Sequence, residues 1–235
     1  METKEPGNIG ASARALKNMG FGNLCLVNPG ANIDDDARRF ARNAVDILKS
    51  ADICSCLEDA VRDKSIIAGT TRRTGRSRGI IFPAESGCKR IYELSSTSKV
   101  AILFGREDRG LLNNEIEECG FLVTLPASTE QPSLNLAQAV LIIAYELSRA
   151  GEIEKHNETG ICHKLASHEE LRSLYERMPE LLKLLDYNPE GDRNINEKII
   201  RNLKHLIGRA GLTDWELRML HGLFSQIERK IKGAG

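Results

Sequence analysis

The chain has 235 residues, of which 41% are hydrophobic, and its 33 Lys and Arg balance 33 Asp and Glu to a formal net charge of zero. This length and apolar content are enough for the core of one large domain, or of one domain with a smaller companion. The neutral balance excludes a uniformly basic nucleic-acid binder, but it is compatible with local basic patches.

The sequence predicts neither a membrane segment nor a metal centre. The longest apolar run, residues 139–145, is far shorter than the roughly 20 residues of a membrane span. The polar start METKEP also lacks the apolar stretch of a signal peptide. The six cysteines are scattered, and only Cys54 and Cys56 are close, without the paired spacing of a zinc site. We therefore expect a soluble cytoplasmic protein with reduced thiols that binds no metal and no membrane.

Short apolar runs alternate with helical patterns in the first part of the chain. The strand-like runs are 24–27, 65–68, 80–82, 100–104 and 121–125, and the helix-like segments lie around 9–18, 34–49, 56–62, 89–95 and 113–118. This alternation predicts an α/β fold, a parallel sheet with helices on both faces. The strand-like runs are continuously apolar, as expected for strands that are buried on both faces.

The first helix-like segment follows a glycine-flanked stretch, PGNIG at residues 6–10, and carries Arg14 on its second turn. A Gly-x-x-Gly step often only permits a tight turn. Arg14 is then either an ordinary surface charge or a functional group, and this stretch alone does not decide between them.

An arginine-rich loop, GTTRRTGRSRG at residues 69–79, follows the strand-like run 65–68. Arg72, Arg73, Arg76 and Arg78 lie within seven residues and have no acidic neighbour in the loop. Such a loop is either solvated or paired with anions. The planar fork of arginine suits bidentate binding of phosphate, which makes an RNA contact the alternative to a solvated loop.

The stretch FGREDRGL, residues 104–111, begins where the strand-like run 100–104 ends. Ligands of open α/β sheets bind beyond the carboxyl ends of the strands. Gly105 would there let a ligand approach the backbone closely. Glu107 then either binds a hydroxyl, an amine or a cation of the ligand, or has a structural role as a cap or as an ion-pair partner of Arg106 or Arg109.

The stretch PSLNLAQAVLIIAYEL, residues 132–147, predicts a helix that is apolar on nearly all sides. Such a helix must be covered on all sides. The sheet covers one side, and we expect a second copy of the chain to cover another, which predicts a homodimer. Ser133 and Asn135 at its start are either N-caps or groups of a functional site.

The composition changes after residue 150. Residues 151–166 are polar and charged, which predicts a linker, and two capping-box pairs mark helix starts beyond it, Ser167 with Glu170 and Thr213 with Glu216. We expect a first domain over residues 1–150, a linker over 151–166 and a small domain of three or four helices over 167–235, with interruptions at Pro179 and at Asn188–Gly191.

One helix of this tail, about residues 194–209, has two faces. Apolar residues occupy one arc, and Lys198, Arg201, His205 and Arg209 occupy the opposite one. The polar arc is either a solvated outer face or a stripe that binds the phosphates of a nucleic acid.

Together these stretches resemble the SPOUT superfamily of RNA methyltransferases, and within it the SpoU/TrmH branch. That branch has an Asn-x-Gly turn followed by an arginine, a Phe-Gly-x-Glu-x-x-Gly-Leu stretch and a Ser-Leu-Asn-x-x-x-Ala stretch. The matching residues, in this order, are Asn8, Gly10 and Arg14, then residues 104–111, then Ser133, Leu134, Asn135 and Ala139. The resemblance covers about residues 1–150, and the helical tail, with GRAGLTDWEL at 208–217, is similar to the TrmJ subgroup. As a departure, the apolar strand that usually precedes the Asn-x-Gly turn is short or missing here.

The resemblance implies a trefoil knot in the C-terminal part of the sheet, a homodimer, and S-adenosyl-L-methionine bound by the loops of the knot. Carried over by position, the cofactor-binding residues are Thr70, Thr71, Arg72, Gly105, Leu125, Ser133, Leu134 and Asn135. Members of the TrmJ subgroup methylate the ribose 2′-hydroxyl of nucleotide 32, a cytidine or uridine in the anticodon loop, which implies a tRNA partner.

The resemblance also implies four catalytic residues, Arg14, Asn8, Glu107 and Asn135. Arg14 is assigned to activation of the hydroxyl. Because a guanidinium stays protonated, we interpret this role as stabilising a developing alkoxide or fixing the adjacent phosphate, which would then take the proton itself. Asn8 would orient the ribose or Arg14, and Glu107 and Asn135 are second candidates for holding Arg14. The residues expected to bind RNA are Arg72, Arg73, Arg76, Arg78, Lys198, Arg201 and Arg209.

Two other functions stay open at this point. One is 2′-O-methylation of rRNA by an enzyme of the same branch, and the other is a non-catalytic RNA-binding module that has kept the fold. The intact set of four implied catalytic residues argues against the second. A nucleotide-binding oxidoreductase is disfavoured because no G-x-G-x-x-G follows a strand.

Overall fold

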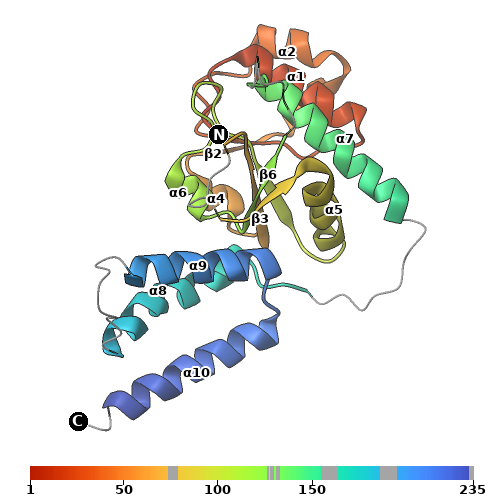
Figure 1. Ribbon diagram of the computed structural model, residues 1–235. Coiled ribbons are helices and arrows are strands. Elements are labelled where there is room, and N and C mark those ends of the chain that lie inside the picture. The colour runs from red at the N-terminus through yellow and green to blue at the C-terminus, as the bar shows by residue number, and fades with distance from the viewer. Residues whose placement is uncertain are drawn as a thin grey trace.

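The computed structural model describes residues 1–73, 79–125, 127, 130, 133–154, 164–185 and 195–232. An α/β part is followed by a tail of helices that lies beneath it in Figure 1. The chain passes from one to the other after the long helix α7, Leu136–Glu154. This helix continues past Ala150, so the first four residues of the predicted linker are helical.

All strand pairs of the described residues are parallel, which confirms the predicted parallel sheet. The strands are β1 (Cys25–Val27), β2 (Asp52–Cys54), β3 (Ile66–Thr71), β4 (Ile81–Pro83), β5 (Val100–Leu103) and β6 (Phe121–Thr124). They form a two-stranded sheet, β1-β2, and a four-stranded sheet in the order β4-β6-β3-β5. The predicted trefoil knot is not tested by this strand order and stays a prediction.

Residues 1–5 form no strand, in line with the expected departure. They run beside the end of β1, where the amide of Glu2 donates to the carbonyl of Val27 at 2.8 Å and the amide of Gly30 donates to the carbonyl of Thr3 at 2.9 Å. The helix α1 begins at once afterwards, at Pro6.

Helices cover both faces of the four-stranded sheet, as predicted. The helices of the α/β part besides α7 are α1 (Pro6–Asn18), α2 (Asp35–Ala41), α3 (Val45–Lys49), α4 (Leu57–Val61), α5 (Ala84–Ser95) and α6 (Asn113–Glu117), with a short 3-10 turn, η1 (Arg42–Ala44). On one face, Ile66 and Phe121 pack with α5 and α7. On the other, Ile67 and Leu122 pack with α4 and α6. This double burial explains why the strand-like runs are continuously apolar.

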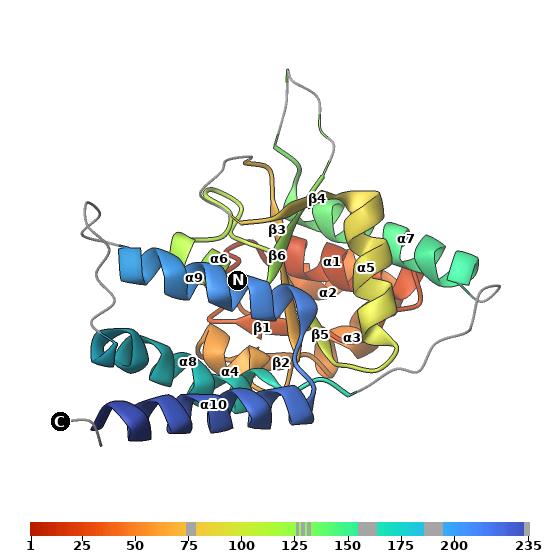
Figure 2. The same ribbon diagram turned by 60° about the horizontal axis from the view of Figure 1, so that its bottom comes forward.

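The tail folds, within residues 164–185 and 195–232, into α8 (His168–Leu184), α9 (Ile195–Ala210) and α10 (Asp214–Lys232). Both predicted capping boxes are present at helix starts. The interruption expected at Pro179 is wrong, because α8 continues through it to Leu184. The one expected at 188–191 lies outside the described residues. Figure 2 shows α8 between α9 and α10, and a core around Leu174 and Ile207 holds the three together. None of the described helices is both long and apolar enough to cross a membrane.

Candidate active site

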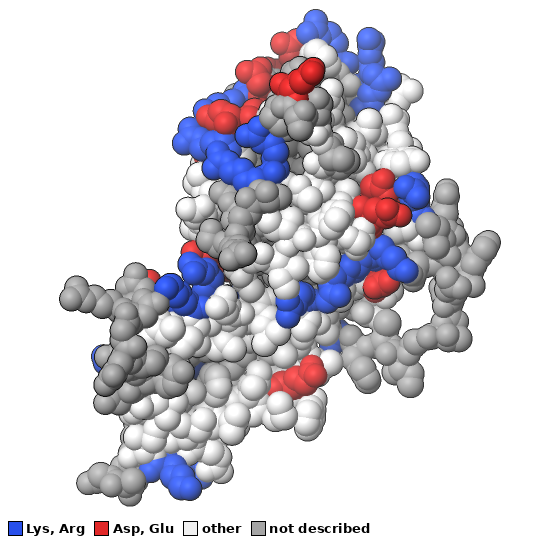
Figure 3. Space-filling view, in the orientation of Figure 1, with Lys and Arg blue, Asp and Glu red and all other residues white. Residues whose placement is uncertain are grey.

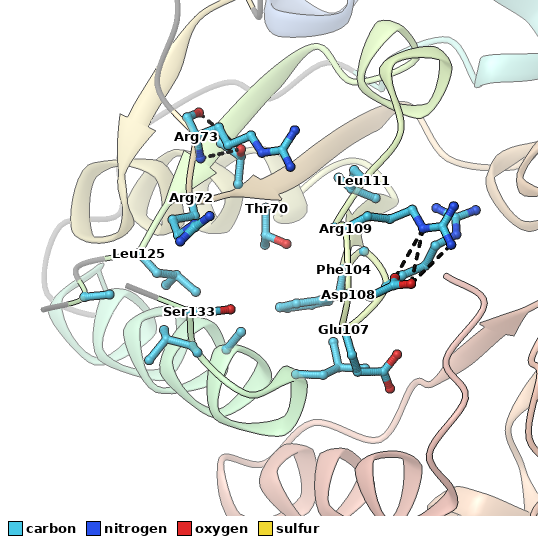
Figure 4. Close-up of a pocket in the computed structure, with 18 residues that line it drawn as sticks. Thr70, Arg72, Arg73, Phe104, Glu107, Asp108, Arg109, Leu111, Leu125 and Ser133 are labelled. Atoms are coloured by element: carbon cyan, nitrogen blue, oxygen red, sulfur yellow. Dashed lines mark hydrogen bonds and ion pairs between the residues drawn. The ribbon is translucent and has the colours of Figure 1, made fainter. Parts of the chain in front are cut away.

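A cavity of about 160 Å³ lies at the carboxyl ends of the strands of the larger sheet. Its walls come from the end of β3, the loop after β5, the segment after β6 and the start of α7 (Figure 4). Seven of the eight predicted cofactor residues line it: Thr70, Thr71, Arg72, Gly105, Leu125, Ser133 and Leu134. Asn135 does not line the cavity. Segments distant in the sequence thus meet at one pocket, as the position of strand ends predicts.

The walls of this cavity are chemically divided. Apolar side chains come from Leu111, Leu125, Leu134, Leu136 and Ala139, and cationic ones come from Arg72, Arg73, Arg106 and Arg109. Arg109, Leu136 and Ala139 were not among the predicted cofactor residues, although all three lie within the matching motifs or next to them. Among the residues that the structure describes, no group of three His, Cys, Asp or Glu would hold a metal ion.

Gly105 lines the cavity and is also required by the fold of the loop itself. A Cβ at this position would lie 2.1 Å from the carbonyl carbon of Gly110, so the loop itself takes the space on that side. The backbones of Arg106 and Gly110 exchange two hydrogen bonds, of 3.1 and 2.9 Å. Gly110 adopts a left-handed φ of +72°, which favours glycine. Both glycines of the motif therefore close the loop that forms one wall.

Arg106 attaches this loop to α6 and to the N-terminal segment. Its guanidinium donates two bonds of 2.9 Å to the carboxylate of Glu115 in α6 and one of 2.7 Å to Glu2. The side chains of Arg106 and Glu115 are only 4% and 5% exposed. The hydrogen bonds to Glu2 and Glu115 hold the pKa of Arg106 above its ordinary value. Arg109, by contrast, forms an exposed pair with Asp108 at 3.2 Å.

Glu107 pairs with neither Arg106 nor Arg109, which corrects the structural role considered from the sequence. Its Oε1 accepts hydrogen bonds from Thr3 Oγ1 at 2.5 Å and from Asn8 Nδ2 at 2.9 Å. Figure 4 shows its carboxyl group directed away from the cavity. Burial favours a higher pKa for Glu107, but the bonds from Thr3, Asn8 and nearby backbone groups outweigh it and hold the pKa below its ordinary value.

Asn135 extends this network to the third motif. Its Nδ2 donates to Asn8 Oδ1 at 2.9 Å, and its Oδ1 accepts from the amide of Ala137 at 2.9 Å. Asn135 is therefore both the N-cap of α7 and a partner of Asn8. The three motifs that are far apart in the sequence are joined in the order Asn135, Asn8, Glu107. These residues hold one another, and within the described residues of this one chain neither Glu107 nor Asn135 bonds to Arg14, so their expected role toward Arg14 stays a prediction.

Arg14 lies on α1, outside the cavity wall. Its side chain is exposed, and no hydrogen bond or ion pair joins it to any other part of the chain that the structure describes. The predicted turn before the helix is wrong, since α1 begins at Pro6 and Asn8 lies in its first turn. Gly10 serves helix packing instead, because a Cβ there would lie 2.0 Å from the carbonyl oxygen of Ala37 in α2.

The predicted RNA-binding residues fall into two places. Arg72 and Arg73 are exposed at the cavity (Figure 4), and Arg76 and Arg78 lie outside the described residues. On α9, Lys198 is exposed, and Arg201 and Arg209 are partly buried. Figure 3 shows the Lys and Arg of this side of the molecule in separate groups, one of them a band where the α/β part meets the tail.

The network makes a prediction for Asn135. Replacing it with alanine removes the N-cap of α7 and the partner of Asn8, and we expect the free energy of unfolding to fall by about 1–2 kcal/mol. Cofactor binding should also weaken, because the first turn of α7 carries Leu136 and Ala139 of the cavity wall. Asn135→Ser keeps a capping oxygen but is too short to reach Asn8, so it should restore most of the stability. Chemical denaturation and calorimetry measure both effects, and equal stability of the alanine variant and the unmodified chain would contradict the assigned cap.

Comparisons with known proteins agree with the motifs. Residues 1–145 match the model of the SpoU rRNA Methylase family. The tRNA (cytidine/uridine-2'-O-)-methyltransferase TrmJ of Escherichia coli is 35% identical over 237 residues, which cover 99% of this chain and 95% of that protein. The tRNA (cytidine/uridine/adenosine-2'-O-)-methyltransferase TrmJ of Pseudomonas aeruginosa is 33% identical over 244 residues, 99% of this chain and 93% of that protein.

Solved structures of methyltransferases are also similar to this chain. The crystal structure of TrmJ from Z. mobilis has a TM-score of 0.77 and 28% identity, and the match covers 96% of each chain. The SpoU methyltransferase AviRb from Streptomyces viridochromogenes, in complex with AdoMet, has a TM-score of 0.51 and 21% identity over 65% of this chain and 58% of that one. The second likeness is one of fold alone.

Proposed function

This chain belongs to the SpoU rRNA methylase family, and on that premise we propose that it is a methyltransferase that uses S-adenosylmethionine to methylate a ribose 2′-hydroxyl of tRNA. We further propose nucleotide 32 of the anticodon loop, a cytidine or uridine, as the target. The main support for this proposal is that the three motifs lie beside one cavity, where hydrogen bonds between Asn135, Asn8 and Glu107 join them.

The walls of the cavity suit the cofactor chemically. The apolar side formed by leucines matches an adenine ring, and the guanidinium groups of Arg72 and Arg109 match the carboxylate of its amino-acid part. When bound, S-adenosylmethionine supplies a methyl group on a positively charged sulfur. We assign Thr70, Thr71, Arg72, Gly105, Leu125, Ser133 and Leu134 to holding it, and Asn135 to positioning the helix turn that completes the wall.

The protein must then bring in the ribose hydroxyl and favour loss of its proton. We assign this task to Arg14, whose guanidinium would stabilise the charge that develops on the hydroxyl oxygen and fix the neighbouring phosphate of the RNA, which would take the proton. Because the pKa of Glu107 lies below its ordinary value, this carboxyl group is ionised at neutral pH and serves as a fixed acceptor for Asn8. The role of Glu107 and Asn135 is then to orient Asn8 toward the substrate.

The tail supports tRNA over rRNA as the substrate. The family model ends at residue 145, whereas relatives named for tRNA methylation match 99% of the chain, helical tail included. We propose that Arg72, Arg73, Lys198, Arg201 and Arg209 contact the RNA backbone, together with Arg76 and Arg78. A chain with zero net charge needs such local patches to bind a polyanion.

A binding titration and a labelling experiment test the proposal. Calorimetry with S-adenosylmethionine separates an enzyme from an RNA-binding module that has merely kept the fold. Incubation with labelled cofactor and equal amounts of tRNA or rRNA then identifies the substrate, and we expect label in tRNA. Label in rRNA alone would favour the other substrate of this branch, and failure to bind the cofactor would refute the enzymatic proposal.

We also propose that the protein is a homodimer through α7. The sequence predicts a helix that is apolar on nearly all sides, and the structure shows which part of its surface is left uncovered by the protomer. Val140, Ile143 and Ala144 are buried within the protomer, while Leu141 and Tyr145, one turn apart, are 39% and 49% exposed. A second copy of this face would cover them.

The dimer proposal predicts that Leu141→Asp gives monomers, because a carboxylate would be buried without a partner in the interface. Ile143 is not a suitable position for this test, since a charge there would enter the protomer's own core. Leu206→Asp on α9 is the matched control, because Leu206 is 48% exposed and lies on another helix. Sedimentation or light scattering gives the mass, and a monomeric unmodified chain would disprove the dimer.

A further inference from the structure

Helix α9 of the tail touches the α/β part by a contact between two glycines. A Cβ on Gly120, just before β6, would lie 2.1 Å from the carbonyl carbon of Gly208 in α9, and a Cβ on Gly208 would lie 2.8 Å from the Cα of Gly120. The two backbones thus meet with no room for any side chain. Figures 1 and 2 both show α9 running directly against the α/β part.

Side chains around this contact hold the helix in place. Arg90 of α5 donates through Nη2 to the carbonyl oxygen of Arg209 at 2.8 Å, so it caps the end of α9. Glu118 of the α/β part lies 3.5 Å from Lys204 of α9 and 3.4 Å from His168 of α8. The tail is therefore docked at a defined place and is not merely tethered.

The docked face of α9 also reaches Gly79. A Cβ on Gly79, which has a φ of +81°, would lie 2.9 Å from Nδ1 of His205. Burial, followed by the charge of Arg201, holds the pKa of His205 below its ordinary value, so the ring packs here as a neutral group. This corrects the reading of His205 as part of a solvated or phosphate-binding stripe. Arg72 and Arg73, which precede Gly79 by six to seven residues in the sequence, line the cavity.

We propose that Gly208, with Gly120 and Arg90, sets the distance between the RNA contacts on α9 and the catalytic cavity, and so determines which nucleotide of a tRNA reaches it. This inference rests on the proposed function. The three residues line no part of the cavity and act as positioning residues. Lys198 and Arg201, which lie on α9 ahead of the docked turn, are held at a fixed place only while α9 is docked.

Gly208→Ala tests the proposal with a single methyl group. Alanine is a better helix former than glycine, so helix propensity alone predicts a more stable α9. The new Cβ would instead meet the backbone of Gly120, and we expect α9 to leave its position. Gly222→Ala in α10 is the matched control, because a Cβ at that helical glycine meets nothing within 4 Å. Arg90→Ala is a second variant, which weakens the docking without adding atoms.

Small-angle X-ray scattering of the full chain should show a larger radius of gyration for Gly208→Ala and no change for Gly222→Ala. The methylation rate is then measured on whole tRNA and on a short single-stranded RNA with the target nucleotide, which cannot reach α9 and the cavity together. We expect Gly208→Ala to lower the methylation rate on tRNA by about 10²-fold, because a misplaced substrate reacts more slowly. The methylation rate on the short RNA and the affinity for the cofactor should not change.

If the ratio of the two methylation rates does not change, the proposal is overturned. An equal fall of both rates would mean that Gly208 has a merely structural role. If Gly208→Ala does not fold, Arg90→Ala must show the same change of ratio in a smaller degree. An unmodified chain that methylates no tRNA would refute the proposed function itself, whereas the scattering result tests the docking independently of activity.

Discussion

Arg14→Ala is expected to lower the single-turnover rate of methyl transfer by about 10²–10³, the usual loss when one preorganised donor to a developing oxyanion is removed. Binding of S-adenosylmethionine should be nearly unchanged, because Arg14 is exposed on α1 and does not line the cavity. The fold should also be unaffected, since no ion pair or hydrogen bond within the described part of the chain depends on this side chain. Two measurements on each variant suffice, a cofactor dissociation constant and a rate.

Two further variants make this test specific. Arg14→Lys should recover only part of the rate, because an ammonium keeps the charge but loses the planar fork. Lys17→Ala removes another cation of the same helix, one that pairs with Asp46, and should leave the rate unchanged. Full activity of Arg14→Ala would remove Arg14 from the mechanism, and loss of cofactor binding would give it a structural role instead.

Arg106→Ala is expected to have the largest effect on stability. It leaves the buried carboxylate of Glu115 without its bidentate partner, and removing one member of a buried ion pair lowers the free energy of unfolding by about 3–5 kcal/mol. The loop that forms one wall of the cavity should loosen at the same time, so cofactor binding should weaken. Urea denaturation measures the first effect and calorimetry the second.

Arg109→Ala is the matched control for the effect on stability. Arg109 lies three residues away in the same loop, but it is 57% exposed and pairs with the exposed Asp108, so its loss should change stability little. The double variant Arg106→Met with Glu115→Leu should recover much of the stability, because it removes both charges together. A single Arg106→Ala variant as stable as Arg109→Ala would contradict the importance of the buried pair.

The sheet and the pocket could be predicted largely from the sequence. Strands buried on both faces are continuously apolar, and loops after parallel strands meet at one edge, so Thr70, Gly105 and Leu125 were expected to lie together. Strand β2 was missed because Asp52–Cys54 is short and open to solvent, with Ile53 64% exposed. An apolar pattern cannot mark a strand that has no buried face.

Features that depend on tertiary contacts could not be predicted. The partners of Glu107 are Thr3 and Asn8, about one hundred residues away in the chain, and no local spacing indicates them. In α7 the apolar pattern is continuous, so it gives no indication that Leu141 faces outward. From the sequence, Gly208 is only a residue of low helix propensity within a helix. The structure shows that Gly120 packs directly against it, which requires a glycine at this position.

The central claim is that this chain methylates a ribose 2′-hydroxyl of tRNA, and mass spectrometry of tRNA tests it most directly. Unmodified tRNA would be incubated with the protein and isotope-labelled S-adenosylmethionine, then digested to nucleosides and to fragments. We expect a labelled methyl group on the ribose of one cytidine or uridine, in the fragment that contains nucleotide 32. A labelled methyl group on a base, or no label in tRNA under conditions in which the cofactor binds, would contradict it.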